Sequence, residues 1–107
     1  MPLTRPKAAQ VNFDVTTISD PLLRFNSDQT GSNDKDAGFI IERGDDTNVG
    51  LVWDESADEF AVVSTTETGS TSGDITISSY ANFRANALNI GGNLTFEGAT
   101  ADDFETT

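Results

Sequence analysis

The 107-residue sequence contains no cysteine and no histidine. It therefore cannot form disulfides, and it lacks the usual ligands of zinc and haem sites. Nucleophilic catalysis that relies on a histidine base is excluded for the same reason. For proton transfer the chain offers only carboxylates, two lysines and one tyrosine. We expect no enzymatic activity and no bound cofactor.

Positive charge is also scarce, because six Lys and Arg stand against eighteen Asp and Glu and give a formal net charge of −12. Binding to nucleic-acid phosphates requires clustered Lys and Arg, and so does binding to an anionic membrane surface. No apolar run approaches the roughly 18 residues of a membrane span. Neither nucleic acid nor membrane is expected as a partner.

Large apolar residues are few. Leu, Ile, Val and Phe together account for 25 of the 107 residues, which is just above the level of about 20% below which highly charged chains remain disordered. A chain of this length buries only about two-thirds of its unfolded surface even when it packs well. We therefore expect a thin core that assembly with further copies completes.

The first ten residues form a distinct segment that contains two prolines and a charge of +2, ahead of a remainder that carries −14. Proline spacing disfavours a helix and favours an extended chain. The sequence predicts either a frayed terminus or a basic arm that docks on a partner. The predicted docking residues are Leu3, Arg5, Pro6 and Lys7.

Residues 11–83 are predicted to form an antiparallel β domain, because apolar residues alternate with polar ones in several short runs. Residues 84–107 are predicted to be a connector, and their composition gives no stop signal before Thr107. Helix is expected only as one turn within 80–88, and residues 65–73 are expected to be an exposed loop. Outside the central segment, strands are predicted at 11–15, 22–25 and 74–78, with a glycine-broken hairpin or last strand at 90–96.

The clearest unit is a three-stranded meander built from 38–43, 48–53 and 59–64, with turn-forming residues between the strands. Alternation places Phe39, Leu51 and Phe60 on one face and Ile40, Val52 and Val63 on the other. Both faces are too apolar for open water, which favours a homotrimer. The fold predicted is therefore all-β: a small antiparallel sandwich or meander, completed by homotrimerisation, with an extended N-terminal arm. Its predicted trimer and core packing residues are Phe39, Ile40, Ile41, Leu51, Val52, Trp53, Phe60, Val62 and Val63.

Other motifs are weaker. Adjacent carboxylates at 45–46, 54–55, 58–59 and 102–103 would suit a glycosidase acid and base, but most fall in predicted turns, where solvated charge is the simpler interpretation. Asp34-Lys35-Asp36 resembles part of a calcium loop whose glycine is displaced and whose last glutamate is missing. Arg43-Gly44-Asp45 matches a tripeptide read by integrins, yet these residues are also ordinary turn formers.

One stretch is more specific. Gly38-Phe-Ile-Ile-Glu-Arg-Gly44, followed by Asn48-Val-Gly-Leu-Val-Trp-Asp-Glu-Ser-Ala-Asp-Glu-Phe60, resembles a segment of tail-fibre and related virion proteins from marine tailed bacteriophages, especially those that infect cyanobacteria. The opening 3–8 and 11–14 are similar to the start of such proteins. Residues 92–107 are similar to a junction that runs on into further β-rich repeats. Together these matches cover about two-thirds of the chain.

The resemblance implies a non-enzymatic virion protein that is made in the host cytoplasm and placed in the tail. Such fibres are homotrimers whose N-terminal part is fixed to a tail or adaptor protein and whose C-terminal part binds the host. The chain would then be the tail-proximal segment that attaches the fibre for host adsorption. The main alternative is a small trimeric capsid decoration, or cement, protein. A lectin or carbohydrate-active enzyme that uses Trp53 and the carboxylates is a third class.

Overall fold

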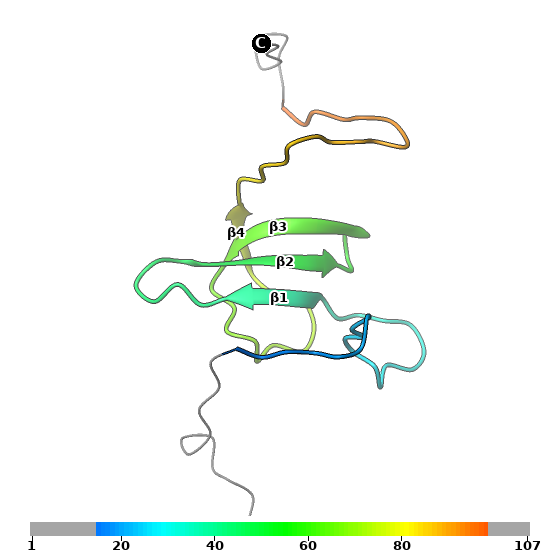
Figure 1. The fold of residues 1–107 in the computed structure, drawn as a ribbon, viewed down its shortest axis with the longest axis vertical. Helices are drawn as coiled ribbons and strands as arrows, with labels where there is room; N and C mark the ends of the chain where they lie inside the picture. The colour runs from blue at the N-terminus through cyan, green and yellow to red at the C-terminus, as the bar shows by residue number, and fades with distance from the viewer. Residues whose placement is uncertain (1–14, 99–107) are drawn as a thin grey trace, which may run out of the picture.

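The chain folds around one four-stranded antiparallel sheet (Figure 1). The structure, a computed structural model, describes residues 15–98. The strands are β1 (Ala37–Ile41), β2 (Asn48–Asp54), β3 (Glu59–Thr65) and β4 (Ile77–Tyr80), and their order in the sheet is their order along the chain. No helix occurs within 15–98. The all-β prediction is confirmed, and of the two predicted forms the sheet is a meander.

The central meander of β1, β2 and β3 forms where the sequence predicts it. Strand β1 pairs with β2 from Ala37 opposite Trp53 to Ile41 opposite Val49, and β2 pairs with β3 along its whole length. The tight turn between β2 and β3 is closed by an N–H of Asp58 that donates to the Asp54 carbonyl over 2.8 Å. Asp58 adopts a φ of 62°, a left-handed conformation that aspartate tolerates better than most residues.

The two faces of the sheet differ in how well they are covered. On one face Val52, Ala61 and Val63 are buried, and Ile40, Ile75 and Ile77 pack against them. On the other face large hydrophobic side chains of β1, β2 and β3 remain exposed. This division follows the predicted alternation, because partners across the register lie on the same face.

The cover over the buried face comes from residues 66–76, which connect β3 to β4 and lie behind the sheet in Figure 1. The prediction of a simple exposed loop here is wrong at its start. Thr65 is fully buried at the end of β3, and Glu67 is buried beside it. A loop of small polar residues can cover apolar side chains because its own backbone groups find partners, as described below.

Several predicted elements outside the meander are absent. The predicted strand at 22–25 does not form. Leu22 is almost fully exposed, so burial of its side chain does not stabilise pairing of this short run with the sheet. The predicted strand at 74–78 lies a few residues later, as β4, which pairs with β3 through a bulge at Ser64 and Thr65. Within 80–88 there is no helical turn, and within 90–96 there is no strand. Most of the predicted strand at 11–15 lies outside the described residues.

Candidate functional site

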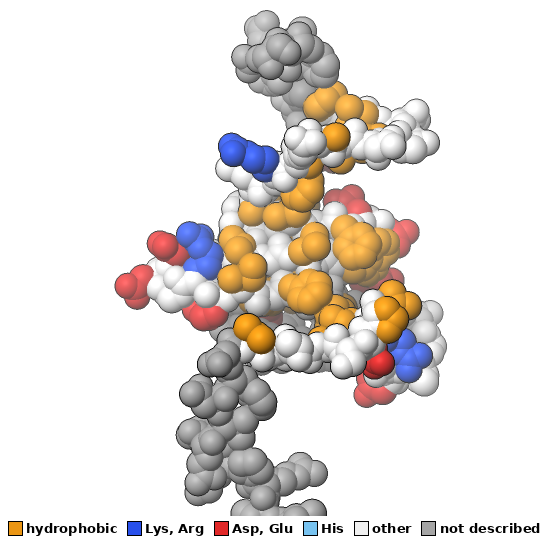
Figure 2. Space-filling model, in the orientation of Figure 1, with side chains coloured by type: hydrophobic (Ala, Val, Ile, Leu, Met, Phe, Trp, Pro, Cys, Tyr) orange, Lys and Arg blue, Asp and Glu red, His pale blue; other side chains and the backbone are white. Residues whose placement is uncertain are grey.

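The strongest candidate for function is the uncovered face of the sheet. Phe39, Ile41 and Leu51 are about half exposed, and Phe60 is 73% exposed. Figure 2 shows hydrophobic side chains gathered over this side of the sheet. No charged side chain interrupts the strand positions of this face, which are Ala37, Phe39, Ile41, Val49, Leu51, Trp53, Phe60, Val62 and Ser64. A contiguous apolar surface of this kind makes this face the candidate interaction site of the chain.

Aromatic contacts hold this face in a defined shape. The rings of Trp53 and Phe60 meet edge to face with their centroids 5.1 Å apart. The indole N–H of Trp53 donates to Oε2 of Glu55 over 2.8 Å, which fixes the direction of its ring. At the other edge, Phe25 meets Phe39 at the same centroid distance and nearly at right angles. Edge-to-face pairs of this kind contribute about 0.5–1.5 kcal/mol beyond area burial, so the face is ordered before anything binds to it.

Behind the sheet, Asp36 joins three separate segments of the chain. Its Oδ1 accepts the N–H of Glu55 in the β2–β3 turn over 2.9 Å. Its Oδ2 accepts the N–H of Ile75 in the covering loop over 3.0 Å, and its own N–H donates to the Gly73 carbonyl over 2.9 Å. Both carboxylate oxygens are therefore occupied by backbone donors. Asp36 fixes the covering loop to the start of β1.

Glu67 organises the covering loop from within. Its Oε1 accepts the N–H groups of Gly69, Ser70 and Thr71 at 2.7, 2.8 and 3.1 Å. The hydrogen bond from the Thr71 side chain, together with these backbone bonds, lowers the pKa of Glu67 to about 2. The carboxylate is therefore ionised at any physiological pH, and the loop is wrapped around a fixed negative charge.

Two further polar residues connect this loop to the strands. Asn48 at the start of β2 donates its Nδ2 to the Glu67 carbonyl over 3.0 Å and to Oε2 of Glu42 over 3.1 Å. Thr65 donates its hydroxyl to the Thr76 carbonyl and accepts the N–H of Glu67 over 3.0 Å. Within 15–98, every buried side-chain polar atom has a partner. The covered face is thus closed by hydrogen bonds as well as by apolar contact.

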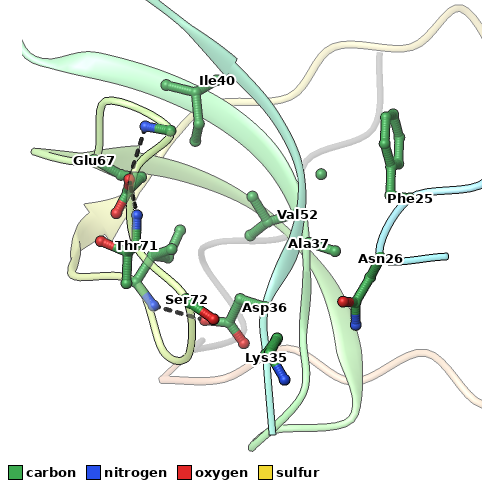
Figure 3. Close-up of a pocket in the computed structure, with 13 residues that line it drawn as sticks. Phe25, Asn26, Lys35, Asp36, Ala37, Ile40, Val52, Glu67, Thr71 and Ser72 are labelled. Carbon is green, nitrogen blue, oxygen red and sulfur yellow. Dashed lines mark hydrogen bonds between the residues drawn. The ribbon is translucent and has the colours of Figure 1, made fainter. Parts of the chain in front are cut away.

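A hollow of about 310 Å³ lies between the covering loop and the segment that leads into β1 (Figure 3). Asp36, Glu67 and Lys35 line it together with apolar residues such as Phe25 and Ile40. The carboxylates are engaged by the backbone donors described above, and Nζ of Lys35 donates to Oε1 of Gln29 over 2.9 Å. The polar groups of this hollow therefore serve the loops that form it, and we assign no ligand to it.

The carboxylate pairs considered for catalysis do not converge. Asp54 is buried, and its Oδ1 accepts from the Ser56 hydroxyl over 2.9 Å. Oε2 of Glu55 accepts from Trp53 and from Asn33. Residues 15–98 bring together no group of three or more acidic, Cys or His side chains able to hold a metal ion, and they contain no helix long and apolar enough to cross a membrane. The pair at 102–103 lies outside the described residues.

The predicted packing residues divide between the two faces. Ile40, Val52 and Val63 lie on the covered face, and the other six, including Trp53, lie on the uncovered face. The predicted docking residues Leu3, Arg5, Pro6 and Lys7 lie outside the described residues. No protein-family model, curated protein or solved structure matches the chain.

Sequence reasoning missed the four polar residues that hold the covering loop, which are Asp36, Asn48, Thr65 and Glu67. A faint signal existed for Glu67, because a glutamate followed by Thr-Gly-Ser can accept the N–H groups of the turn that begins with it. For Asp36 there was none, since its partner Ile75 is 39 positions away in the sequence.

Proposed function

We propose that this chain is a structural protein of a phage virion, the N-terminal segment of a tail fibre, which attaches the fibre trimer to the tail for host adsorption. The observation that carries the proposal is the uncovered apolar face of the sheet. The assignment to a tail fibre rests on the resemblance of 38–60 to tail-fibre proteins of marine phages, and that stretch contains most of the residues of this face.

The energetics of the face favour assembly. Burying an aliphatic or aromatic side chain contributes roughly 1.5–3 kcal/mol. Phe39, Leu51 and Phe60 are each about half exposed or more in the single chain. Three copies that pack these faces around a shared axis would each bury several such side chains. An aromatic face that is already ordered loses little entropy on association.

The proposed role is positional and involves no catalysis. The carboxylates that a hydrolase would need are engaged with local backbone and side-chain donors, as at Asp36 and Asp54. A rigid trimer at the base of a fibre would hold the fibre in a fixed direction and transmit contact at its tip to the tail. Its partners would be two further copies of itself and one tail or adaptor protein.

The basic arm is the proposed link to that adaptor. Residues Leu3, Arg5, Pro6 and Lys7 place a charge of +2 ahead of a body at −14. An acidic groove on another virion protein would attract such an arm. Deletion of residues 1–8 should leave the trimer intact and abolish incorporation into particles. Normal copy number of the truncated protein on virions would show that the arm is not the anchor.

Sedimentation velocity of the full chain at micromolar concentration tests the trimer. We expect a trimer for the native chain and a folded monomer for Leu51→Asp, because that substitution places a charge in the middle of the face. The matched control is Leu22→Asp, where the native leucine is 85% exposed and is not part of a strand, and this variant should remain trimeric. A native chain that sediments as a folded monomer would refute the proposal.

A second measurement separates the fibre from the capsid decoration protein. The copy number per virion, and whether the reading frame continues past Thr107, differ between the two. A low copy number at the tail and a longer reading frame are expected for the fibre. A protein that ends here and covers the capsid in many copies would favour the decoration protein instead.

A further inference from the structure

We infer that residues 81–98, the arm segment, of one copy pack across the uncovered sheet face of a neighbouring copy, so that the assembly is held together by exchanged arms. This inference rests on the proposed homotrimer and names the contact that would complete it. The arm segment and the sheet face both leave large hydrophobic side chains uncovered in the single chain.

The arm segment has no regular structure and leads away from the sheet after β4 (Figure 1). It carries large hydrophobic side chains that its own chain leaves uncovered. Phe83 is 71% exposed and Leu88 is 67% exposed, and Ile90 and Leu94 are about half exposed. Figure 2 shows hydrophobic side chains along the extension above the sheet. An extended segment with this composition gains stability only by lying on another surface.

In the single chain, the arm segment leaves most of its own face uncovered. Its base is tied to the sheet, where the Ala81 N–H donates to the Val62 carbonyl over 2.9 Å. Further along, Thr95 and Glu97 line an open hollow with Phe60 and Val62. The arm side chains between these two points stay exposed, as does the β1 side of the face.

Charge favours a second copy as the occupant. Between Ala81 and Phe96 the arm segment contains no carboxylate and one positive charge, Arg84. The receiving face contains no charged strand position, and one end of it is bordered by the acidic β2–β3 turn with Glu55 and Asp58. An arm laid on a neighbouring face would therefore bury apolar side chains without burying charge, and Arg84 would meet carboxylates at the rim.

The exchange of arms is also compatible with a closed, symmetric trimer. Each copy offers one arm and one face, so a head-to-tail contact repeated around a three-fold axis leaves neither without a partner. A foreign protein in the same place would leave three arms exposed for every three faces covered.

Cross-linking tests the contact directly, because the native chain contains no cysteine. Copies with Leu51→Cys are mixed and assembled with copies carrying Leu88→Cys, and a short bismaleimide then joins neighbouring thiols. We expect a covalent dimer that joins position 51 of one copy to position 88 of another. The control replaces Leu88→Cys by Ser70→Cys on the loop that covers the opposite face. This control should link about tenfold less, since only the arm contact raises the local concentration of thiols.

Fluorescence of the single tryptophan gives a second readout that does not depend on engineered thiols. Trp53 lies on the receiving face, so covering by an arm should shift its emission to shorter wavelength. In the full chain, Leu88→Asp should reverse that shift, and Leu22→Asp should leave it unchanged. Circular dichroism of each variant checks that the sheet is retained.

The outcomes separate this inference from the proposed function. A native chain that is monomeric in sedimentation overturns both. Two outcomes would overturn the exchanged arm and still support the trimer. One is a trimer in which cross-links join only position 88 to position 88, and the other is a trimer in which Leu88→Asp leaves the Trp53 emission unchanged. A trimer with 51–88 links between copies and an emission shift that depends on Leu88 supports both.

Discussion

The carboxylate of Asp36 should contribute more to stability than any other acidic side chain that bridges distant segments of this sheet. It accepts two backbone hydrogen bonds, from Glu55 at 2.9 Å and from Ile75 at 3.0 Å. Hydrogen bonds to a charged group contribute about 1.5–3 kcal/mol each. The low end applies because the side chain is partly exposed and water can replace some of the loss. Asp36→Ala should therefore lower the free energy of unfolding by about 3 kcal/mol.

The control for this prediction is two residues away. Asp34 has the same charge, its side chain is 86% exposed, and its Oδ1 lies 3.3 Å from Nζ of Lys35. Exposed pairs of this kind contribute about 0.2–1 kcal/mol, so Asp34→Ala should change stability by less than about 1 kcal/mol. Asp36→Asn is a milder variant. It keeps one acceptor oxygen and should fall between the other two.

Urea unfolding followed by Trp53 fluorescence measures these differences. For a small domain, a slope of about 1 kcal/mol/M predicts that Asp36→Ala lowers the midpoint by about 3 M. All variants must be compared at one protein concentration, because assembly adds to apparent stability. Equal midpoints for Asp36→Ala and Asp34→Ala would refute the idea that Asp36 fixes the covering loop to the sheet.

Two further predictions concern the loop and the sheet. Glu67 has a folded pKa of about 2, below its ordinary value of 4.5, so its stabilising effect is complete above about pH 4.5 and is lost as pH falls toward 2. The melting temperatures of the native chain and of Glu67→Gln should therefore converge as pH is lowered from 4.5 to 2. A difference in melting temperature that stays constant from pH 7 to 2 would contradict this. In Gly50→Ala the new Cβ would lie 2.5 Å from the Phe39 carbonyl oxygen, so the β1–β2 pairing must shift and the melting temperature should fall by several degrees. Gly91→Ala meets nothing within 4 Å and should melt like the native chain, and equal melting of the two alanine variants would show that β1 and β2 do not approach this closely.

The meander was predictable because its information is local. Alternating apolar residues and turn formers lie within a few positions of one another, and each strand of 37–65 pairs with its neighbour along the chain. The division of Phe39 and Ile40 onto opposite faces follows from the same alternation. Which face the chain would cover for itself did not follow, because the covered face is the less apolar of the two in sequence and includes Asn48, Asp54 and Glu59.

The rest depended on contacts between distant residues. Residues 65–73 have no apolar pattern, so their sequence does not predict that Thr65 and Glu67 are buried. The predicted strand at 22–25 failed for the opposite reason. Its residues have the right composition, but the structure offers them no ladder to join, and Phe25 contributes instead through its ring against Phe39.

The strand order has a consequence for how the chain folds. Every strand pairs with its neighbour in sequence, so the sheet can grow by successive hairpin closures, each on the microsecond scale typical of hairpins. The bond from Ile75 to Asp36 is different, since it closes a loop across 39 positions. During synthesis on a ribosome, β1, β2 and β3 can pair before Ile75 has been made. The apolar face around Val63 is then exposed to solvent until the covering loop has been synthesised and packs against it. We expect that delay to be the step at which a nascent chain is most exposed to aggregation.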